Sequence, residues 1–297
     1  MKKGLSLINP YTLTEFLVHY EKDEPFMVRP QHEIIKPLLE LPFLVSLNSL
    51  LNSWPHIIQA HLPDVRDEAS SIDTTTKDAL KLFNNGMGLL FNEAHTISPL
   101  LNQWLDDLRK DLGLSAMTIG RCLIYATPDG KGTATHFDQN INFVLQVHGT
   151  KKWKMAPNQD VVNPLTRHTM GMDPDPEMMS YLDGPLPTQM PEDAQEFVLT
   201  PGSVLFVPRG YWHSTEAEGD ALALNFTFTP PTWIDLFTAA MRSRLALIPE
   251  WRETADGVSD EARRAQAQQK FDFLLATLAQ ELPHWRASDV LEATDPL

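Results

Sequence analysis

Cysteine is almost absent from this sequence of 297 residues, in which Cys122 is the single example. One cysteine forms no disulfide within the chain, which excludes a small secreted scaffold held together by disulfides. Basic residues are also scarce, since 24 Lys and Arg stand against 39 Asp and Glu, and the formal net charge is −15 at pH 7. Binding to a phosphate backbone needs a basic surface, so we expect no nucleic-acid partner.

Long apolar runs are missing as well. No run reaches the roughly 18 apolar residues that a membrane-spanning helix needs, and the basic start MKK is not followed by an apolar segment typical of a secretion signal. We therefore expect no membrane partner and a cytoplasmic location. The hydrophobic fraction of 42% is ordinary for a chain that buries a globular core.

The periodicity of apolar residues changes twice along the chain. Residues 1–115 predict a mainly helical segment that packs on the core, and residues 116–230 contain short alternating or β-branched runs bounded by Pro, Gly, Asp and Asn. A stretch without periodicity at 157–196, rich in proline, methionine and acidic residues, interrupts these runs and predicts a lid-like insertion. Helical spacing returns in residues 231–297, whose apolar stripe packs on the parent domain or forms the interface of a homodimer. The pattern predicts a mainly β fold with flanking helices.

One of the β-type runs, THFDQNINFVLQVHGTKKW from Thr135 to Trp153, carries polar residues where a core strand is expected. In a strand, side chains two positions apart share a face, so His136, Asp138 and Asn142 are expected on one face, opposite an apolar face. Buried polar groups need partners, and a metal ion with a polar ligand would supply them.

A third metal ligand is available at His213, which ends another apolar run after the turn PRGYW. Two histidines and one carboxylate, here His136, Asp138 and His213, make the facial triad that binds Fe(II) and leaves coordination positions open. The spacing His-x-Asp alone is a weak signal, and a hydrogen-bonded core histidine is the ordinary alternative. The combination of both motifs within one β-rich block favours the metal site.

The two stretches THFDQNINFVLQVHGTKKWKM and LTPGSVLFVPRGYWHSTEAEGDALALNFTF resemble the core motifs of the JmjC branch of Fe(II)/2-oxoglutarate oxygenases, and most of all its bacterial cupin-like and ribosomal-oxygenase group. The position of Asn142 also resembles the asparaginyl hydroxylase that acts on hypoxia-inducible factor. The resemblance covers roughly residues 80–240. It implies a double-stranded β-helix of the cupin or jelly-roll type, with Fe(II) bound by His136, Asp138 and His213.

The same resemblance implies where the co-substrates 2-oxoglutarate and O₂ are used. Lys151 matches the lysine that pairs with the far carboxylate of 2-oxoglutarate, in a charge-assisted hydrogen bond. Thr133 matches a hydroxyl donor to that carboxylate, and Tyr125 is a second candidate donor, with a plain core tyrosine as the alternative. Asn142 is expected near the iron-bound carboxylate, and Asn225 matches a similar family position. Catalysis is expected to need no protein acid or base beyond the metal centre.

The resemblance implies hydroxylation of a carbon in a protein or peptide side chain, with succinate and CO₂ as co-products. Two alternatives stay open at the level of the sequence. The first is the same chemistry on a free amino acid or a small biosynthetic intermediate. The second is a metal-binding cupin without oxygenase activity.

Overall fold

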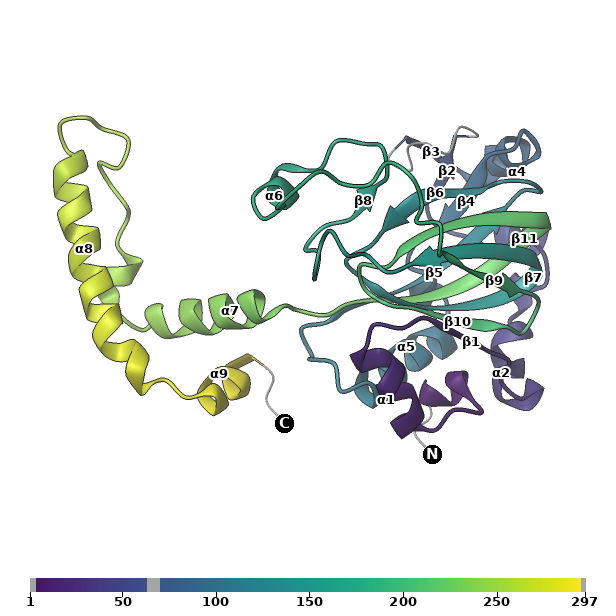
Figure 1. The fold of residues 1–297 in the computed structure, drawn as a ribbon, viewed down its shortest axis with the longest axis horizontal. Coiled ribbons are helices and arrows are strands. Elements are labelled where there is room, and N and C mark those ends of the chain that lie inside the picture. The colour runs from purple at the N-terminus through teal and green to yellow at the C-terminus, as the bar shows by residue number, and fades with distance from the viewer. Residues whose placement is uncertain (1–3, 63–69, 295–297) are drawn as a thin grey trace. The chain divides into compact units, whose positions relative to one another are not determined.

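The computed structural model describes residues 4–62 and 70–294. By their internal contacts these residues form two units, one of Met1–Leu114 with Ile119–Thr229 and one of Ser115–Thr118 with Pro230–Leu297. The first unit contains every strand of the described chain, and the second adds only helices and loops after the last strand. The expectation of a mainly β fold with flanking helices is therefore confirmed for the first unit (Figure 1).

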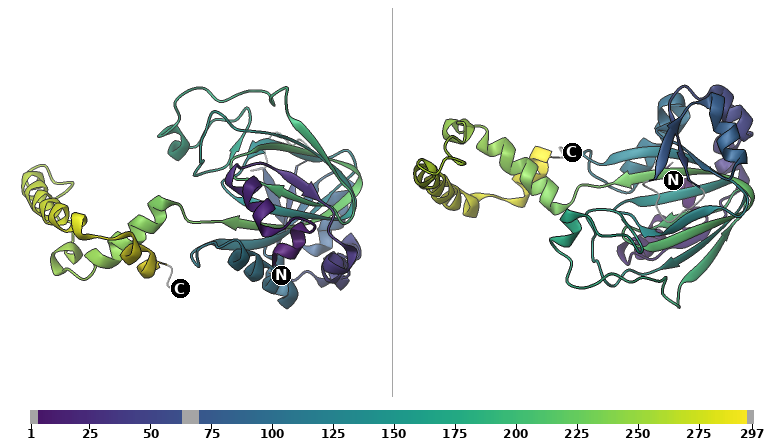
Figure 2. Two further views of the ribbon diagram at one scale, coloured as in Figure 1. Left: turned by 60° about the horizontal axis from the view of Figure 1, so that its bottom comes forward. Right: turned by 90° about the horizontal axis from the view of Figure 1, so that it is seen from above.

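The helices of the first unit begin at caps that the sequence supplies. Ser98 accepts a hydrogen bond from the backbone of Leu101 and Pro99 follows it, which starts α5, and Thr12 forms a reciprocal capping box with Glu15 in α1. Figures 1 and 2 show α1, α2 and α5 along one side of the strands, with β8 and α6 on the other. The helices are α1 (Leu13–Glu21), α2 (His32–Leu39), α3 (Leu47–Ser53), α4 (Thr76–Asn84), α5 (Pro99–Asp111) and α6 (Pro176–Met179).

The eleven strands of the described residues form one continuous antiparallel sheet in the order β1-β10-β7-β11-β5-β4-β2-β3. Outside this order, β6 pairs with β11, β8 pairs with β6, and β9 pairs with β7. The two longest strands, β7 and β11, pair with each other over nearly their whole length and carry different neighbours at their two ends. The strands are β1 (Phe26–Val28), β2 (Ile58–His61), β3 (Ser71–Thr74), β4 (Gly88–Phe91), β5 (Ile119–Thr127), β6 (Gly132–Phe137), β7 (Ile141–Ala156), β8 (His168–Thr169), β9 (Gln195–Leu199), β10 (Val204–Val207) and β11 (Trp212–Thr229).

The run from Thr135 to Trp153, which was expected to form one strand, is divided between two strands. β6 ends at Phe137, Asp138 lies in the connection that follows, and β7 begins at Ile141. β7 itself continues through Gly149 to Ala156. The single strand expected over this run was therefore wrong, because alternation of side chains can continue across a short connection and does not mark where a strand ends.

The second unit consists of α7 (Trp233–Leu245), α8 (Arg264–Glu281) and α9 (Ala287–Thr294) with their connections. Ser259, which precedes Asp260 and Glu261 in the manner of a helix cap, does not cap α8, because this helix begins five residues later, after Arg263. Large apolar side chains such as Trp233, Leu247 and Phe273 are exposed on this unit, and the homodimer interface there stays a prediction. No helix among the described residues is long and apolar enough to cross a membrane.

Candidate metal centre and cavity

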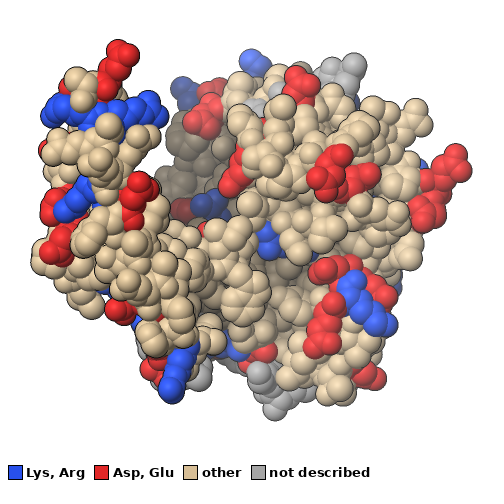
Figure 3. All heavy atoms as spheres, turned by 60° about the vertical axis from the view of Figure 1, so that its left-hand side comes forward, with Lys and Arg blue, Asp and Glu red and all other residues tan. Residues whose placement is uncertain are grey.

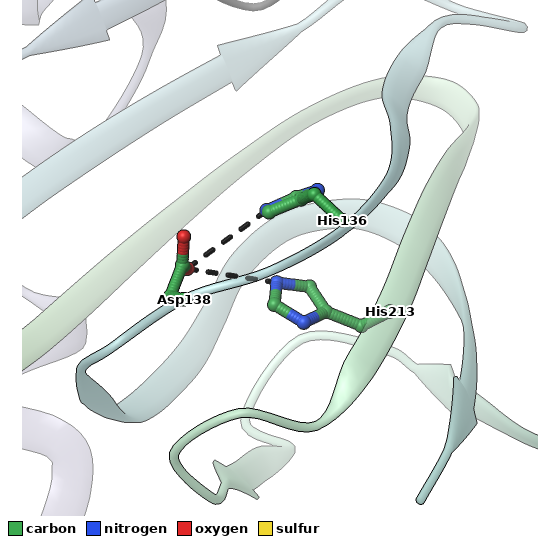
Figure 4. Close-up of side chains that lie close together, drawn as sticks. All are labelled: His136, Asp138 and His213. Atoms are coloured by element: carbon green, nitrogen blue, oxygen red, sulfur yellow. Dashed lines mark ion pairs between the residues drawn. The ribbon is translucent and has the colours of Figure 1, made fainter. Parts of the chain in front are cut away.

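Three side chains converge where β6 and β11 lie side by side. His136 near the end of β6 pairs with His213 at the start of β11, and Asp138 follows His136 by two residues. The Asp138 Oδ2 atom lies 3.8 Å from Nε2 of His136 and 3.7 Å from Nε2 of His213 (Figure 4). One possible ligand atom from each residue lies within 4.8 Å of the others, so the three residues could hold a metal ion together.

Backbone carbonyl groups fix the orientation of both imidazoles. Nδ1 of His136 lies 2.7 Å from the carbonyl oxygen of Ala134, and Nδ1 of His213 lies 2.9 Å from that of Tyr211. A carbonyl oxygen only accepts, so each Nδ1 donates the hydrogen bond and each ring turns its Nε2 toward Asp138. Hydrogen bonds of this kind orient metal-ligating histidines in proteins.

Asp138 is held in its ionised form. Burial alone would raise the pKa of Asp138, but the two imidazoles and the Arg167 guanidinium outweigh burial and leave the pKa below its ordinary value. Arg167 donates from Nε to the other carboxylate oxygen, Oδ1, at 3.1 Å. The carboxylate therefore has one oxygen bound by arginine and the other directed at the histidines.

The three residues open onto a cavity of about 190 Å³ inside the first unit. All eight residues singled out from the sequence line this cavity, and they come from strands far apart along the chain. They are Tyr125, Thr133, His136, Asp138, Asn142, Lys151, His213 and Asn225. Leu123, Asn140, Val144, Trp153, Arg167, Thr215, Ala223 and Thr227 complete the lining.

A bend in β7 brings Lys151 into the cavity. Gly149 has a positive φ of 67°, and a Cβ atom there would lie 2.2 Å from the carbonyl oxygen of Asp220, so glycine is required. Before the bend Asn142 faces the cavity at an even position, whereas after it Lys151 and Trp153 face the cavity at odd positions. The register thus buries Lys151, which is 4% exposed, and leaves Lys152 outside.

Lys151 lies among hydroxyl and aromatic groups. Its ammonium donates to Oγ1 of Thr127 at 2.9 Å and lies 5.7 Å from the ring centroid of Tyr125. A buried ammonium group is costly without counter-charge, and an anionic ligand in the cavity would offset that cost. Thr133 lies on the same wall, where its hydroxyl is 2.9 Å from that of Thr215.

An amide and hydroxyl network forms the opposite wall. Oδ1 of Asn142 accepts from Thr227 Oγ1 at 2.7 Å and from Asn225 Nδ2 at 3.2 Å, and all three side chains are buried. Oδ1 of Asn225 has no hydrogen-bond partner in the structure although it is buried. Polar groups buried this way call for a ligand or ordered water.

The sequence did not point to Arg167 or Trp153. Trp153 stacks on the His213 ring with centroids 5.6 Å apart and an angle of 23° between planes. The strand alternation of β7 offered a signal for Trp153, two residues after Lys151. For Arg167 the only available signal was that it is the single Lys or Arg in residues 157–196.

His168 lies in the aperiodic insertion, where a polar residue is ordinarily solvated, but it is only 4% exposed. It lies in the two-residue strand β8, and its ring contacts those of Phe137 and Trp212, at centroid distances of 5.8 and 6.1 Å. The insertion thus packs directly on the two strands that carry the histidines. The burial of His168 could not be predicted from the sequence, because the insertion has no periodic pattern of apolar residues. Cys122 is buried, and burial raises the pKa of its thiol well above the ordinary value, in agreement with the core role expected for it.

The methionines and the acidic residues of the insertion at 157–196 face different directions. Met178 is fully buried with Phe137 and Trp212, and Met170 and Met190 pack against the same cluster. The acids point outward and most are exposed, as for Asp160 and Glu192. Three of the five methionines of the insertion therefore build its own core, and do not form a surface for substrate.

Comparison with known proteins adds to this geometry. A family model described as the JmjC domain matches residues 102–236. The uncharacterized protein YxbC of Bacillus subtilis (strain 168) is 31% identical over 283 residues, which cover 93% of this chain and 85% of YxbC. Rat ribosomal oxygenase 1 is 29% identical over 168 residues, 55% of this chain and 25% of that protein. The chain belongs to the JmjC family of 2-oxoglutarate-dependent oxygenases.

A solved structure described as YcfD, a ribosomal oxygenase from Escherichia coli in complex with cobalt and 2-oxoglutarate, superimposes with a TM-score of 0.58 at 17% identity. The superposition covers 93% of this chain and 68% of YcfD. This likeness, with the JmjC match, confirms the double-stranded β-helix expected from the motifs. Membership in an oxygenase family also removes support for a metal-binding cupin without oxygenase activity.

Proposed function

We propose that this oxygenase hydroxylates a carbon of a protein or peptide side chain, with Fe(II) held by His136, Asp138 and His213. The observation that carries the proposal is the convergence of these three ligand atoms within 4.8 Å, at one cavity that also contains the buried Lys151. Two imidazoles and one carboxylate are the donor set that suits Fe(II). When bound, iron and 2-oxoglutarate supply the oxidation by O₂, with succinate and CO₂ as co-products.

The chain's own residues bind and orient in this proposal. Lys151 pairs with the far carboxylate of 2-oxoglutarate, assisted by the hydroxyl of Thr133 and by Tyr125. The amide nitrogens of Asn142 and Asn225 donate to the end nearer the metal, whereas the buried Oδ1 of Asn225, which only accepts, is left for a donor such as ordered water. The stacked Trp153 and the packed insertion keep bulk water from the histidines.

A protein substrate is supported by the name ribosomal oxygenase 1, which relatives in rat and zebrafish carry. The outward-facing acids of residues 157–196 also favour a basic peptide over an acidic one. Figure 3 shows acidic groups scattered over the surface together with basic groups. We infer that basic segments of the substrate flank the side chain that reacts.

Anaerobic titration with Fe(II) and 2-oxoglutarate tests the site. The folded protein should develop a weak visible charge-transfer band only when both are present. Asp138→Ala should abolish the band, whereas Asp160→Ala, which alters an exposed acid of the insertion, should leave it unchanged. A folded wild-type protein without the band would refute the site.

The substrate class needs its own experiment. Ribosomal proteins cut after acidic residues keep their basic stretches, and incubation with enzyme, Fe(II) and 2-oxoglutarate should add the mass of one oxygen atom to a basic peptide. A pool of amino acids and metabolites serves as the matched comparison. Oxygen added only in that pool would favour the small-molecule alternative and contradict a protein substrate.

A further inference from the structure

One cationic side chain reaches the metal centre from the insertion. Arg167 donates from Nε to Oδ1 of Asp138 at 3.1 Å and from Nη1 to Oγ1 of Thr169 at 3.0 Å. Thr169 is the strand partner of His136 in the pairing of β8 with β6. Arg167 therefore closes a ring of contacts that joins Asp138 to the strand position opposite His136.

The backbone around Arg167 is fixed rather than loosely apposed. His168 pairs with Phe137 and packs its ring against Phe137 and Trp212, the two neighbours in sequence of the metal-site histidines. The amide of Met170 also donates to the carbonyl of Thr135 at 2.8 Å. These contacts set the distance from the Arg167 backbone to Asp138.

We propose that Arg167 is a positioning residue that holds Asp138 by Oδ1, keeps Oδ2 directed at the two histidines, and thereby couples the insertion at 157–196 to metal binding. This inference rests on the proposed function, because it assumes that Asp138 is a metal ligand.

Arginine suits this role because its guanidinium is planar and donates in fixed directions to two acceptors at once. The terminal torsion of an aspartate is soft and nearly two-fold, so an unrestrained carboxylate exchanges its oxygens or offers both to one ion. With Oδ1 engaged by Arg167, one oxygen remains for the metal. A single-oxygen ligand leaves a coordination position that the co-substrates need.

The coupling is reciprocal. A metal ion that draws Asp138 into one orientation also fixes Arg167, and through Thr169 and His168 it steadies β8. The backbone amides of residues 166–172 should then exchange hydrogen more slowly when metal is bound. Removal of the guanidinium should break this dependence even where the insertion stays folded.

Titration with Co(II), read by its visible d–d absorption, tests the inference directly. Arg167→Gln should weaken Co(II) binding by roughly 10- to 100-fold, the usual range for a residue that orients a ligand, and should change the d–d spectrum. Arg167→Lys keeps the charge but loses the paired donors, so its affinity for Co(II) should lie between that of the wild type and that of Arg167→Gln. Hydrogen exchange at 166–172 should slow with Co(II) in the wild type and not in Arg167→Gln.

Arg209→Gln is the matched control. Arg209 also anchors the insertion, through two hydrogen bonds to the carbonyl of Pro164, but the charges that lower the pKa of the Asp138 carboxyl are those of His136, His213 and Arg167. Wild-type Co(II) affinity in this variant is expected. Equal weakening in both variants, or an Arg167→Gln protein with wild-type affinity and spectrum, would overturn the inference alone. A wild-type protein that binds no Co(II) would overturn the proposed metal site as well.

Discussion

Replacement of Lys151 by methionine separates binding of the co-substrate from stability of the fold. Methionine has a similar length and no charge, and position 151 is 4% exposed. In the proposed site the ammonium makes a charge-assisted hydrogen bond to the far carboxylate of 2-oxoglutarate. Hydrogen bonds to charged groups contribute about 1.5–3 kcal/mol, which corresponds to a loss of affinity of roughly 10- to 150-fold at about 1.4 kcal/mol per factor of ten.

The thermal stability of Lys151→Met without 2-oxoglutarate should be equal to or higher than that of the wild type. The variant no longer buries an ammonium group, and the Thr127 hydroxyl that accepts from it at 2.9 Å loses one hydrogen bond. That loss costs about 1 kcal/mol, and it is set against the several kcal/mol that desolvation of one ion costs. We expect the thermal midpoint of the metal-loaded variant to equal or exceed that of the wild type, and 2-oxoglutarate to raise only the wild-type midpoint.

Calorimetric titration of 2-oxoglutarate into Mn(II)-loaded protein measures the affinity, and thermal unfolding with and without 2-oxoglutarate measures the second effect. Lys152→Met is the matched control, because Lys152 is the next residue of β7, its side chain is 45% exposed and it pairs with Glu218 at the surface. It should bind 2-oxoglutarate as the wild type does. A Lys151→Met protein that binds 2-oxoglutarate with wild-type affinity would refute the assignment of Lys151.

Three further predictions follow from other features. Gly149→Ala should lower the free energy of unfolding by at least about 1–3 kcal/mol, the cost of a strained backbone, in urea denaturation, and it should also weaken 2-oxoglutarate binding because the bend places Lys151. Burial, followed by the charge of Arg167, lowers the pKa of His168, so this imidazole resists protonation in the folded state and takes up a proton more readily in the unfolded chain. The free energy of unfolding of the wild type relative to His168→Phe should therefore fall as the pH drops below about 6.5. A difference that does not depend on pH would contradict this. If α8 forms a homodimer interface, Phe273→Glu at a side chain 62% exposed should reduce the mass measured by light scattering, whereas Lys154→Glu should not.

Short-range patterns in the sequence were sufficient for the parts of the site that lie on regular strands. Alternation placed His136 and Asn142 toward one side, and that relation survived although the strand is broken at Asp138. The cap at Ser98 fixed the start of α5 in the same local way. These features depend on neighbours within a few residues, so the sequence displays them directly.

The contributions that escaped prediction depend on contacts between distant segments. Arg167 reaches Asp138 across 29 positions, from a stretch with no period. His168 is buried because the rings of Phe137 and Trp212 meet it, and neither is close to it in sequence. A polar residue in an aperiodic segment is ordinarily exposed, so the composition of the segment predicted an exposed His168 where the structure has a buried one.

The bend at Gly149 links these two kinds of information. A straight β7 would direct Lys151 and Trp153 to the side opposite Asn142, because side chains alternate. The bend changes which positions face the cavity, and β11 accommodates it with register shifts between Glu218 and Ala223. One strand therefore lines the cavity both near the histidines and at Lys151. The glycine that allows this is visible in the sequence, but its effect depends on the carbonyl of Asp220 lying 2.2 Å from where a Cβ would be. A single close approach between two strands thus decides which residues of β7 face the cavity.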